Sequence, residues 1–314
     1  MKTREQNICF RIFMNNMRYA PIIIFAFNRL DSLKNSIASL LYNLESADSD
    51  LFVFVDGARE QKDGEKEKVR AVQEYVKSIS GFKSLNYTFS PENKGLGASI
   101  IAGVTEVISK YGRAIVLEDD LLVQPNFLAF INQGLEKYQY EGKIFSICGY
   151  TNKISVPCTY FEDAYVCTRS SSWGWATWAD RWNSVDWVLE PFAQYESQKS
   201  AFNKWGGSDC FGMLKGWHEG RNKSWAIRFC FSQFLQDKLS VFPVKSLVSN
   251  DGFDGSGTNC KKWSRFEFEL EKSGKKNFEW PNSMKMNKRI AKRALSYNSL
   301  TIRAFSKIMY MIYG

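Results

Sequence analysis

The sequence lacks the features of several familiar protein classes. It contains no run of about 18 apolar residues, the length that a membrane-spanning helix requires. Its first 20 residues carry Lys, Arg and Glu, whereas a secretory leader has an apolar stretch followed by small residues. We therefore expect no export and a cytoplasmic location, with residues 1–17 as an N-terminal extension.

Cysteine and histidine occur without a recognisable functional pattern. The seven cysteines are an odd number and include no Cys-x-x-Cys pair, which indicates neither a disulfide framework nor a thiolate zinc site and fits a reducing compartment. His218 is the only histidine, and no Gly-x-Ser-x-Gly segment accompanies it, so a Ser-His-Asp triad is not expected. We interpret His218 as incidental to function.

Acidic residues are absent from the end of the chain. None follows Glu279, whereas seven Lys and Arg residues do. These seven residues account for much of the excess of positive charge in the formal net charge of +9. We expect residues 263–314 to form a basic helical tail with two alternative roles. It either lies on an anionic surface at the inner face of the cytoplasmic membrane or packs on the domain with a solvated basic face. No nucleic-acid partner is expected, because no recognised binding module accompanies the charge.

Strand-like and helix-like segments alternate through the first half of the chain. Five apolar runs predict strands: 21–27, 51–55, 85–89, 113–117 and 144–148. Apolar residues at helical spacing predict helices between them. This alternation predicts an α/β fold with a mostly parallel sheet flanked by helices on both faces. After Gly149 the pattern becomes aromatic-rich and irregular.

Polar residues follow four of the predicted strands. Ligands of such sheets bind beyond the carboxyl ends of the strands, so these residues are candidates for contact with ribose, base, phosphate and metal. They are Asn28 and Arg29, Asp56 and Gly57, Asn93 to Gly97, and Glu118 to Asp120. A dehydrogenase or P-loop enzyme is not indicated, because the third glycine of a dinucleotide fingerprint and a Gly-Lys-Ser or Gly-Lys-Thr loop are both missing.

Three consecutive carboxylates, Glu118, Asp119 and Asp120, end the fourth apolar run. Their mutual repulsion requires a cation or a set of backbone N–H groups to offset it. Mg²⁺ or Mn²⁺ takes one or two carboxylates together with water and phosphate oxygens, which favours Asp120 as a metal ligand and its neighbour as a ribose ligand. A solvated acidic turn is the alternative.

These residues resemble the nucleotide-sugar half of GT-A (Rossmann-like) glycosyltransferases, nearest to the N-acetylglucosaminyltransferase I group and bacterial family 2-like enzymes. The resemblance rests on Asp56-Gly57, Asn93-x-Gly95, the acidic cluster and the Ser-Trp-Gly-Trp segment that ends at Trp175, in order over about residues 19 to 260. It implies that Asp56 meets uracil, Asp119 the ribose and Asp120 a Mn²⁺ or Mg²⁺ ion. It further implies that the remaining candidates lie along the nucleotide-sugar: Asn28, Arg29, Asn93, Lys94, Gly95, Glu118, Trp173 and Trp175. For Trp178 and Trp182, which follow in the same segment, ordinary core packing is the alternative.

The catalytic base does not carry over from the family. The stretch that matches the family's Trp-Asp-Asp-Trp-like segment here reads Ser-Trp-Ala-Ile-Arg over residues 224–228. Asp209 is the substitute, because its Gly-Gly-Ser-Asp segment resembles the Gly-Gly-Glu-Asp loop of other GT-A enzymes, and Glu219 is the second choice. Asp209 as a helix N-cap is the alternative. The late loop 251–259 offers Asp254 or Asn259 as a further metal ligand.

We therefore expect a metal-dependent, inverting glycosyltransferase of surface polysaccharide or lipopolysaccharide assembly. The donor is a UDP-sugar, and the acceptor is a saccharide or a lipid-linked saccharide. We expect residues 18–150 to bind the donor and residues 151–262 to supply the acceptor and catalytic half of the same domain. The rivals are a sugar-nucleotide nucleotidyltransferase and a catalytically inactive sugar- or membrane-binding module.

Overall fold

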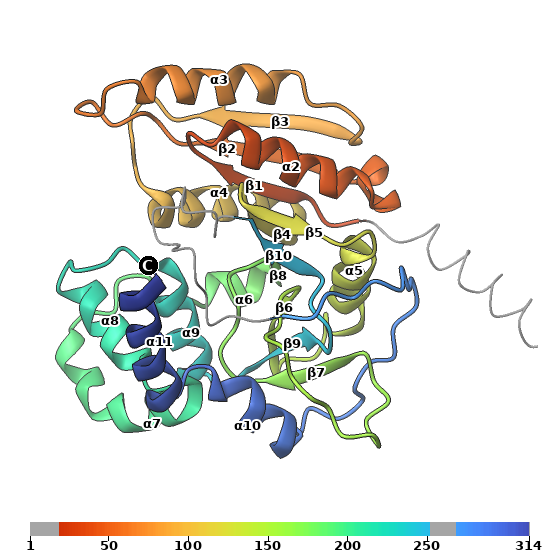
Figure 1. Ribbon diagram of the computed structural model, residues 1–314, viewed down its shortest axis with the longest axis vertical. Coiled ribbons are helices and arrows are strands. Elements are labelled where there is room, and N and C mark those ends of the chain that lie inside the picture. The colour runs from red at the N-terminus through yellow and green to blue at the C-terminus, as the bar shows by residue number, and fades with distance from the viewer. Residues whose placement is uncertain (1–18, 252–267, 314) are drawn as a thin grey trace, which may run out of the picture.

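The computed structural model describes residues 19–251 and 268–313 of the 314-residue chain. Their centre is an eight-stranded mixed sheet in the order β3-β2-β1-β4-β8-β6-β9-β7 (Figure 1). The strands of this sheet are β1 (Ile22–Ala26), β2 (Asp50–Val55), β3 (Ser84–Phe89), β4 (Arg113–Glu118), β6 (Ile144–Cys148), β7 (Ala164–Cys167), β8 (Trp175–Trp178) and β9 (Leu239–Pro243). A second sheet pairs β5 (Leu121–Val123) with β10 (Val248–Asn250).

The direction of the strands divides the large sheet into two parts. Strands β3, β2, β1 and β4 are parallel, so their carboxyl ends meet at one edge. Strand β8 runs antiparallel between β4 and β6, and β7 runs antiparallel to β9 at the far edge. The fold is therefore α/β with a mostly parallel sheet, as the alternation of strands and helices predicts, and it is GT-A-like, as the resemblance implies.

Helices cover both faces of the sheet. The helices up to β6 are α2 (Leu30–Leu41), η1 (Leu44–Asp48), α3 (Glu65–Lys77), α4 (Leu96–Tyr111) and α5 (Phe127–Lys137). Those after it are α6 (Ala179–Asn183), η2 (Phe192–Gln198), α7 (Lys199–Gly206), α8 (Cys210–His218), α9 (Trp225–Leu235), α10 (Lys288–Ser296) and α11 (Leu300–Tyr313). Helices α2, α3 and α5 pack on one face, and α4, α6 and α9 pack on the other. Each buries a stripe of apolar residues at helical spacing, which is why the sequence pattern identifies the helices of the first half.

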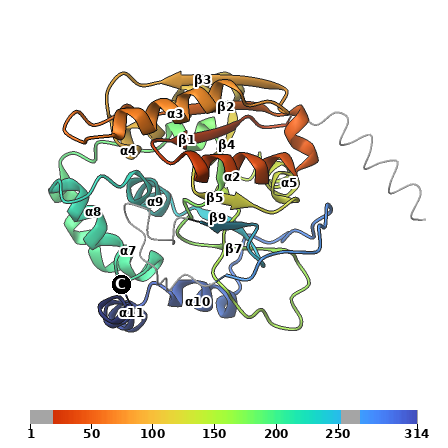
Figure 2. The same ribbon diagram turned by 45° about the horizontal axis from the view of Figure 1, so that its top comes forward.

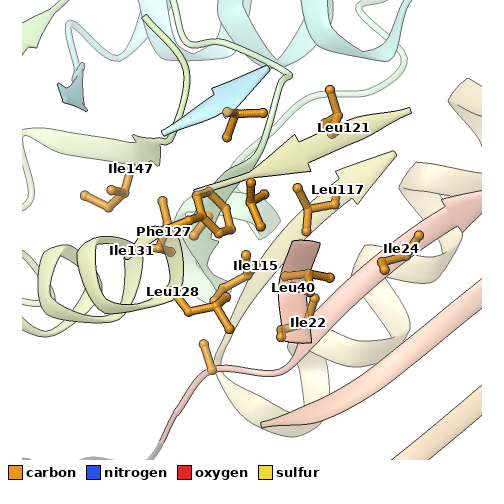
Figure 3. Close-up of a cluster of buried hydrophobic side chains, with 14 of the residues drawn as sticks. Ile22, Ile24, Leu40, Ile115, Leu117, Leu121, Phe127, Leu128, Ile131 and Ile147 are labelled. Carbon is orange, nitrogen blue, oxygen red and sulfur yellow. The ribbon is translucent and has the colours of Figure 1, made fainter. Parts of the chain in front are cut away.

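The larger core lies between the sheet and the face covered by α2, α3 and α5. Figure 3 shows its centre, where Ile22 and Ile24 of β1 lie near Ile115 and Leu117 of β4 and near Phe127 of α5. All five side chains are fully buried. This core fixes the ends of β1 and β4 relative to each other, and both strands end at candidate site residues.

The chain after Gly149 returns to the same sheet. It supplies the strands β7, β8 and β9. These strands were not predicted, because the sequence after Gly149 is irregular and rich in aromatic residues. Strand β8 has four residues, all buried, so it shows neither the alternation of a half-exposed strand nor the length of a clear apolar run. The residues after Gly149 are therefore part of the central sheet as well as of the helices beside it.

The C-terminal helices pack against the domain rather than projecting from it. Ile290 and Ala291 of α10 are buried in a cluster with residues of β7 and β9, which agrees with the packed alternative for the first part of the predicted tail. Figure 2 shows α10 and α11 next to each other along the edge of the molecule opposite β3. Within residues 19–251 and 268–313, no helix is long and apolar enough to cross a bilayer.

Candidate active site

The loops after β1, β2, β3 and β4 meet at one edge of the sheet because these four strands are parallel. Hydrogen bonds join the predicted residues there in two groups. Arg29 contacts Asp119 and Asp120, and Asp56 contacts the backbone of Lys94 and Gly95. The sequence thus predicted which residues share this edge, although their contacts were not foreseeable.

Arg29 bridges the two aspartates of the acidic cluster. Its Nη1 donates to Asp120 Oδ2 at 3.0 Å, and its Nη2 donates to Asp119 Oδ1. The backbone N–H of Phe27 lies 3.4 Å from Asp119 Oδ2. One guanidinium therefore offsets part of the repulsion between two buried carboxylates.

The other oxygen of Asp120 has no such partner. Asp120 Oδ1 is buried, and within the part of the chain that the structure describes no hydrogen-bond donor reaches it. A buried carboxylate oxygen left without a partner is costly, so this atom fits a role as ligand to a cation. The described residues contain no group of three or more His, Cys, Asp or Glu that could hold a metal. A cation here would therefore need water and phosphate oxygens to complete its shell, which is typical of Mg²⁺.

Glu118 and Asp119 of the acidic cluster hold their protons more tightly than isolated carboxyls do. Burial, together with the charges of Asp120 and Asp119, raises the pKa of Glu118 to about 8. Burial raises the pKa of Asp119 to about 6 although the Arg29 guanidinium pulls it down. A bound cation would reverse this effect, because it favours the ionised carboxylates.

Asp56 organises the turn after β3. Its Oδ1 accepts from the backbone N–H of Gly57 at 3.0 Å and of Lys94 at 2.9 Å, and its Oδ2 accepts from that of Gly95 at 2.8 Å. Gly95 has a φ of +77°, a conformation that glycine adopts without strain. An ionised carboxylate can accept about four hydrogen bonds, so one position remains for a ligand such as the N–H of uracil. The contact with uracil stays a prediction.

Asn93 and Asn28 each donate a side-chain hydrogen bond to a residue of another segment. Asn93 Nδ2 donates to the carbonyl oxygen of Gly57 at 2.8 Å and so holds the two loops together. Asn28 Nδ2 donates to Glu65 Oε1 at 3.2 Å, and Arg59 forms an ion pair with the same carboxylate. The hydrogen bonds from Arg59 lower the pKa of Glu65 to about 2. Sequence reasoning missed Arg59 and Glu65, because neither directly follows a strand.

The end of β10 lies beside the acidic cluster. Because β10 pairs with β5, the backbone N–H of Asp251 donates to the carbonyl oxygen of Asp120 at 2.8 Å. Asp251 is exposed, and in the sequence it is only the start of the late loop. Asp254 and Asn259, the two residues proposed from that loop, lie outside the described residues.

A cavity of about 310 Å³ lies between the loops around 150 and 170, helix α9 and helix α10. Uncharged polar side chains line much of it: Thr151, Asn152, Ser170, Ser171, Ser224 and Asn298. Arg169 is the one charged residue among the described residues of its lining. Helix α10 contributes Ala294 and Leu295, so residues expected as a tail form a wall of this cavity.

The two tryptophans of the predicted donor pocket have different surroundings. Trp173 is half-buried, lines the cavity and packs edge-on against Tyr150 with ring centroids 4.5 Å apart. Trp175 is fully buried, and its ring stacks with those of Trp182 and Trp225 at 5.8 and 5.0 Å. The expectation of a sugar contact is therefore wrong for Trp175, because core side chains cover its ring. For Trp173 it stays a prediction.

Asp209 and Glu219, the two candidate bases, each form an ion pair with an arginine. Asp209 precedes α8 but makes no side-chain capping hydrogen bond. It forms a bidentate pair with Arg169, with Nη1 to Oδ1 at 2.8 Å and Nη2 to Oδ2 at 2.9 Å. Burial opposes ionisation, but the hydrogen bonds and charge of Arg169 keep the pKa of Asp209 below its ordinary value. Glu219 is exposed and paired with Arg221, and neither Asp209 nor Glu219 lines the cavity itself.

Helix α9 begins at the cavity. Ser224 caps it by accepting a hydrogen bond from the backbone N–H of Ile227, and Ala226 in its first turn lines the cavity. Ala226 occupies the place of a carboxylate in the family's Trp-Asp-Asp-Trp-like stretch. Among the described lining residues there is no Asp or Glu, and the charged residue of the lining, Arg169, is paired with Asp209.

Comparisons with known proteins give a family match over part of the chain. The family model described as Glycosyl transferase family 2 matches residues 22–154. Solved structures with similarity include the mannosyltransferase PcManGT from Pyrobaculum calidifontis in complex with GDP-Man and Mn²⁺, at 12% identity and a TM-score of 0.34 over 52% of this chain and 46% of that one. They also include S. aureus TarS, at 10% identity and a TM-score of 0.39 over 75% of this chain and 38% of that one.

This chain spans less than half the length of either structure, and likenesses this distant say nothing about its donor or acceptor. No curated protein matches the sequence. The matched segment runs from β1 past β6 and contains all four of the loops that carry the predicted donor-site residues. Residues 22–154 are a glycosyl transferase family 2 domain.

Proposed function

We propose that this chain is a metal-dependent, inverting glycosyltransferase that uses a UDP-sugar. The observation that carries the proposal is the acidic cluster. Arg29 holds one oxygen each of Asp119 and Asp120, and the other oxygen of Asp120 is buried without a hydrogen-bond partner among the described residues. When bound, Mn²⁺ or Mg²⁺ would neutralise the charge that develops on the departing diphosphate.

The residues around the cluster have separate roles in this proposal. Asp120 holds the cation, Asp119 binds the ribose, and Asp56 uses its remaining acceptor position for uracil. Arg29 moves from the aspartates to the diphosphate when the donor and cation arrive, because both ligands then compete for its current partners. Glu118, Asn93 and Gly95 shape the loops, and Asn28 and Lys94 lie against the nucleotide.

The cavity beside α9 binds the acceptor in this proposal. Its hydroxyl and amide lining suits a saccharide, and Trp173 offers an aromatic ring of the kind on which sugars pack. Asp209 takes the proton of the attacking hydroxyl, which requires the acceptor to displace its pairing with Arg169. Residues 18–150 then form the donor half and residues 151–262 the acceptor half. The setting in surface polysaccharide or lipopolysaccharide assembly, with a saccharide or lipid-linked acceptor, belongs to the same proposal.

Product analysis tests the proposal against a sugar-nucleotide nucleotidyltransferase. The chain is incubated with a UDP-sugar and Mn²⁺, and the released products are separated by ion-exchange chromatography. Free UDP is expected, because the bond to the anomeric carbon breaks. Pyrophosphate in its place would replace the proposal with the rival.

A catalytically inactive sugar-binding module is the second candidate. It is favoured by Ala226, which leaves the described lining of the cavity without a carboxylate. Metal-dependent hydrolysis of the donor by the wild-type chain, lost in Asp120→Ala, would exclude it. Donor binding without release of UDP under any acceptor tested would favour it.

A further inference from the structure

Helix α11 exposes several apolar side chains. Leu300, Phe305 and Ile308 are 70%, 55% and 55% exposed, and they lie on one side of the helix together with Ala304. The opposite side carries Ser306, which is buried, and Arg303, whose Nη1 donates to Ser208 Oγ at 3.1 Å. Ile302 and Met309 of the same helix are half-buried, so α11 carries apolar residues toward the domain as well as exposed ones. Exposed apolar patches of this kind mark interaction surfaces.

Helix α10 exposes cations beside this apolar patch. Ile290 and Ala291 face the domain, whereas Lys288, Arg289 and Lys292 are exposed. Neither helix contains an acidic residue, and none occurs in the sequence after Glu279. Helices α10 and α11 follow each other directly in the chain and lie next to each other in both views (Figures 1 and 2). We call the exposed cations of α10 and the exposed apolar residues of α11 together the C-terminal surface.

We propose that the C-terminal surface binds an anionic lipid bilayer. The side chains of Leu300 and Ile308 insert between the headgroups, while the cations of α10 contact anionic headgroups. Two different attractions act together in such a site, and each alone gives weak, reversible binding. The complementarity of charge is the reason for choosing a lipid surface over a second copy of this chain, whose own C-terminal surface would repel it.

The position of this surface also has a consequence for the cavity. Ala294, Leu295 and Asn298 line the cavity from the other side of the same C-terminal segment. Binding at the C-terminal surface would therefore hold the cavity close to the bilayer. This inference does not depend on the proposed transferase activity, because lipid binding needs neither donor nor cation.

Vesicle sedimentation tests the inference on the full chain. Vesicles of phosphatidylglycerol and phosphatidylcholine in equal parts are expected to pellet the wild-type chain at 0.1 M salt, and vesicles of phosphatidylcholine alone to pellet far less. The variant Lys288→Glu/Lys292→Glu should reduce the partition coefficient at least about tenfold, since each Lys near such a surface contributes about 1 kcal/mol, or about fivefold. The variant Leu300→Ser/Ile308→Ser should reduce it by about tenfold or more.

Matched variants on other surfaces serve as controls. Lys66→Glu/Arg70→Glu changes two exposed cations at the same spacing on α3, and Leu44→Ser/Tyr140→Ser removes two apolar side chains that are 79% and 92% exposed. Both should bind vesicles as the wild type does, and melting temperatures should be equal across the set. Equal loss in the controls, or no binding by the wild type, would overturn the inference. So would sedimentation velocity showing a dimer that Leu300→Ser/Ile308→Ser dissociates.

Discussion

Glu118 has no salt-bridge partner among the described residues, unlike its neighbours Asp119 and Asp120, which share Arg29. Its carboxylate is half-buried, and its raised pKa of about 8 reflects burial and the two neighbouring charges. The folded state therefore binds a proton at Glu118 more tightly than the unfolded state does. As a result, stability is fully present below the ordinary pKa of a glutamate and falls as the pH rises toward 8.

Replacing Glu118 by Gln should stabilise the metal-free chain at pH 8. The gain is expected to be about 1–2 kcal/mol, smaller than the full pKa shift implies because solvent screens a half-buried group. Urea unfolding at pH 8 and at pH 4.5 measures it, and the difference between variant and wild type should nearly vanish at pH 4.5. Equal stability of the two proteins at pH 8 would show that Glu118 is not strained by its neighbours.

Asp56→Asn should weaken both the fold and donor binding. The amide replaces one carboxylate oxygen with a donor that faces backbone N–H groups, so at least one N–H loses its acceptor at an expected cost of about 1–3 kcal/mol. The same change disturbs the turn at Lys94 and Gly95. Thermal unfolding and the Kd for UDP check the two effects separately. Unchanged values for both would contradict the place given to Asp56.

Asp209→Asn separates the role of a base from that of an ion-pair partner. As the proposed base, Asp209 should contribute about 10² to 10⁴ in turnover. We expect that loss in the rate of UDP release, with the Kd for UDP unchanged. Arg169→Lys is the companion variant, because it keeps the charge beside Asp209 and should reduce turnover far less. A full rate in Asp209→Asn would exclude this residue as the base.

At the scale of single elements, the strands and α-helices up to β6 could be predicted apart from the short strand β5, whereas several later elements could not. The first five strands of the predicted series are apolar runs, and apolar stripes at helical spacing separate them, so pattern alone locates them within one or two residues. Strand β8 is four residues long and buried on both sides. Its Trp175 therefore looks, in sequence, the same as an aromatic residue of a binding loop.

Trp173→Ala and Trp175→Ala should have different effects, one on acceptor binding and the other on stability. Trp175 is fully buried among aromatic rings, so its removal leaves a cavity and should cost about 3–5 kcal/mol. Trp173 is half-buried at the cavity, so its removal should cost less stability and instead raise the KM for the acceptor. Denaturant unfolding and steady-state kinetics distinguish the two. Equal destabilisation by both variants would contradict the assignment.

On the scale of the whole molecule, the sheet explains which parts of the site the sequence could reveal. Parallel strands bring their carboxyl ends to one edge whatever the details of the loops, so Arg29, Asp56 and Asp120 could be grouped from order alone. The pairing of Asp209 with Arg169 joins residues 40 positions apart in irregular sequence. The contact of α10 with the cavity joins still more distant segments. No local pattern predicts such contacts, because they depend on how later elements pack.

The central claim is that Asp120 holds a divalent cation together with a nucleotide diphosphate. Its most direct test is the shift in melting temperature of the full chain with UDP, with Mn²⁺ and with both, in the wild type, in Asp120→Asn and in the control Asp180→Asn, whose carboxylate is 71% exposed on α6. The wild type and the control should be stabilised most by UDP and Mn²⁺ together. With UDP at 100 times its Kd in the presence of Mn²⁺, the free energy of unfolding should rise by about 2.7 kcal/mol. Asp120→Asn should lose this joint effect. Stabilisation of Asp120→Asn equal to that of the wild type would contradict the claim.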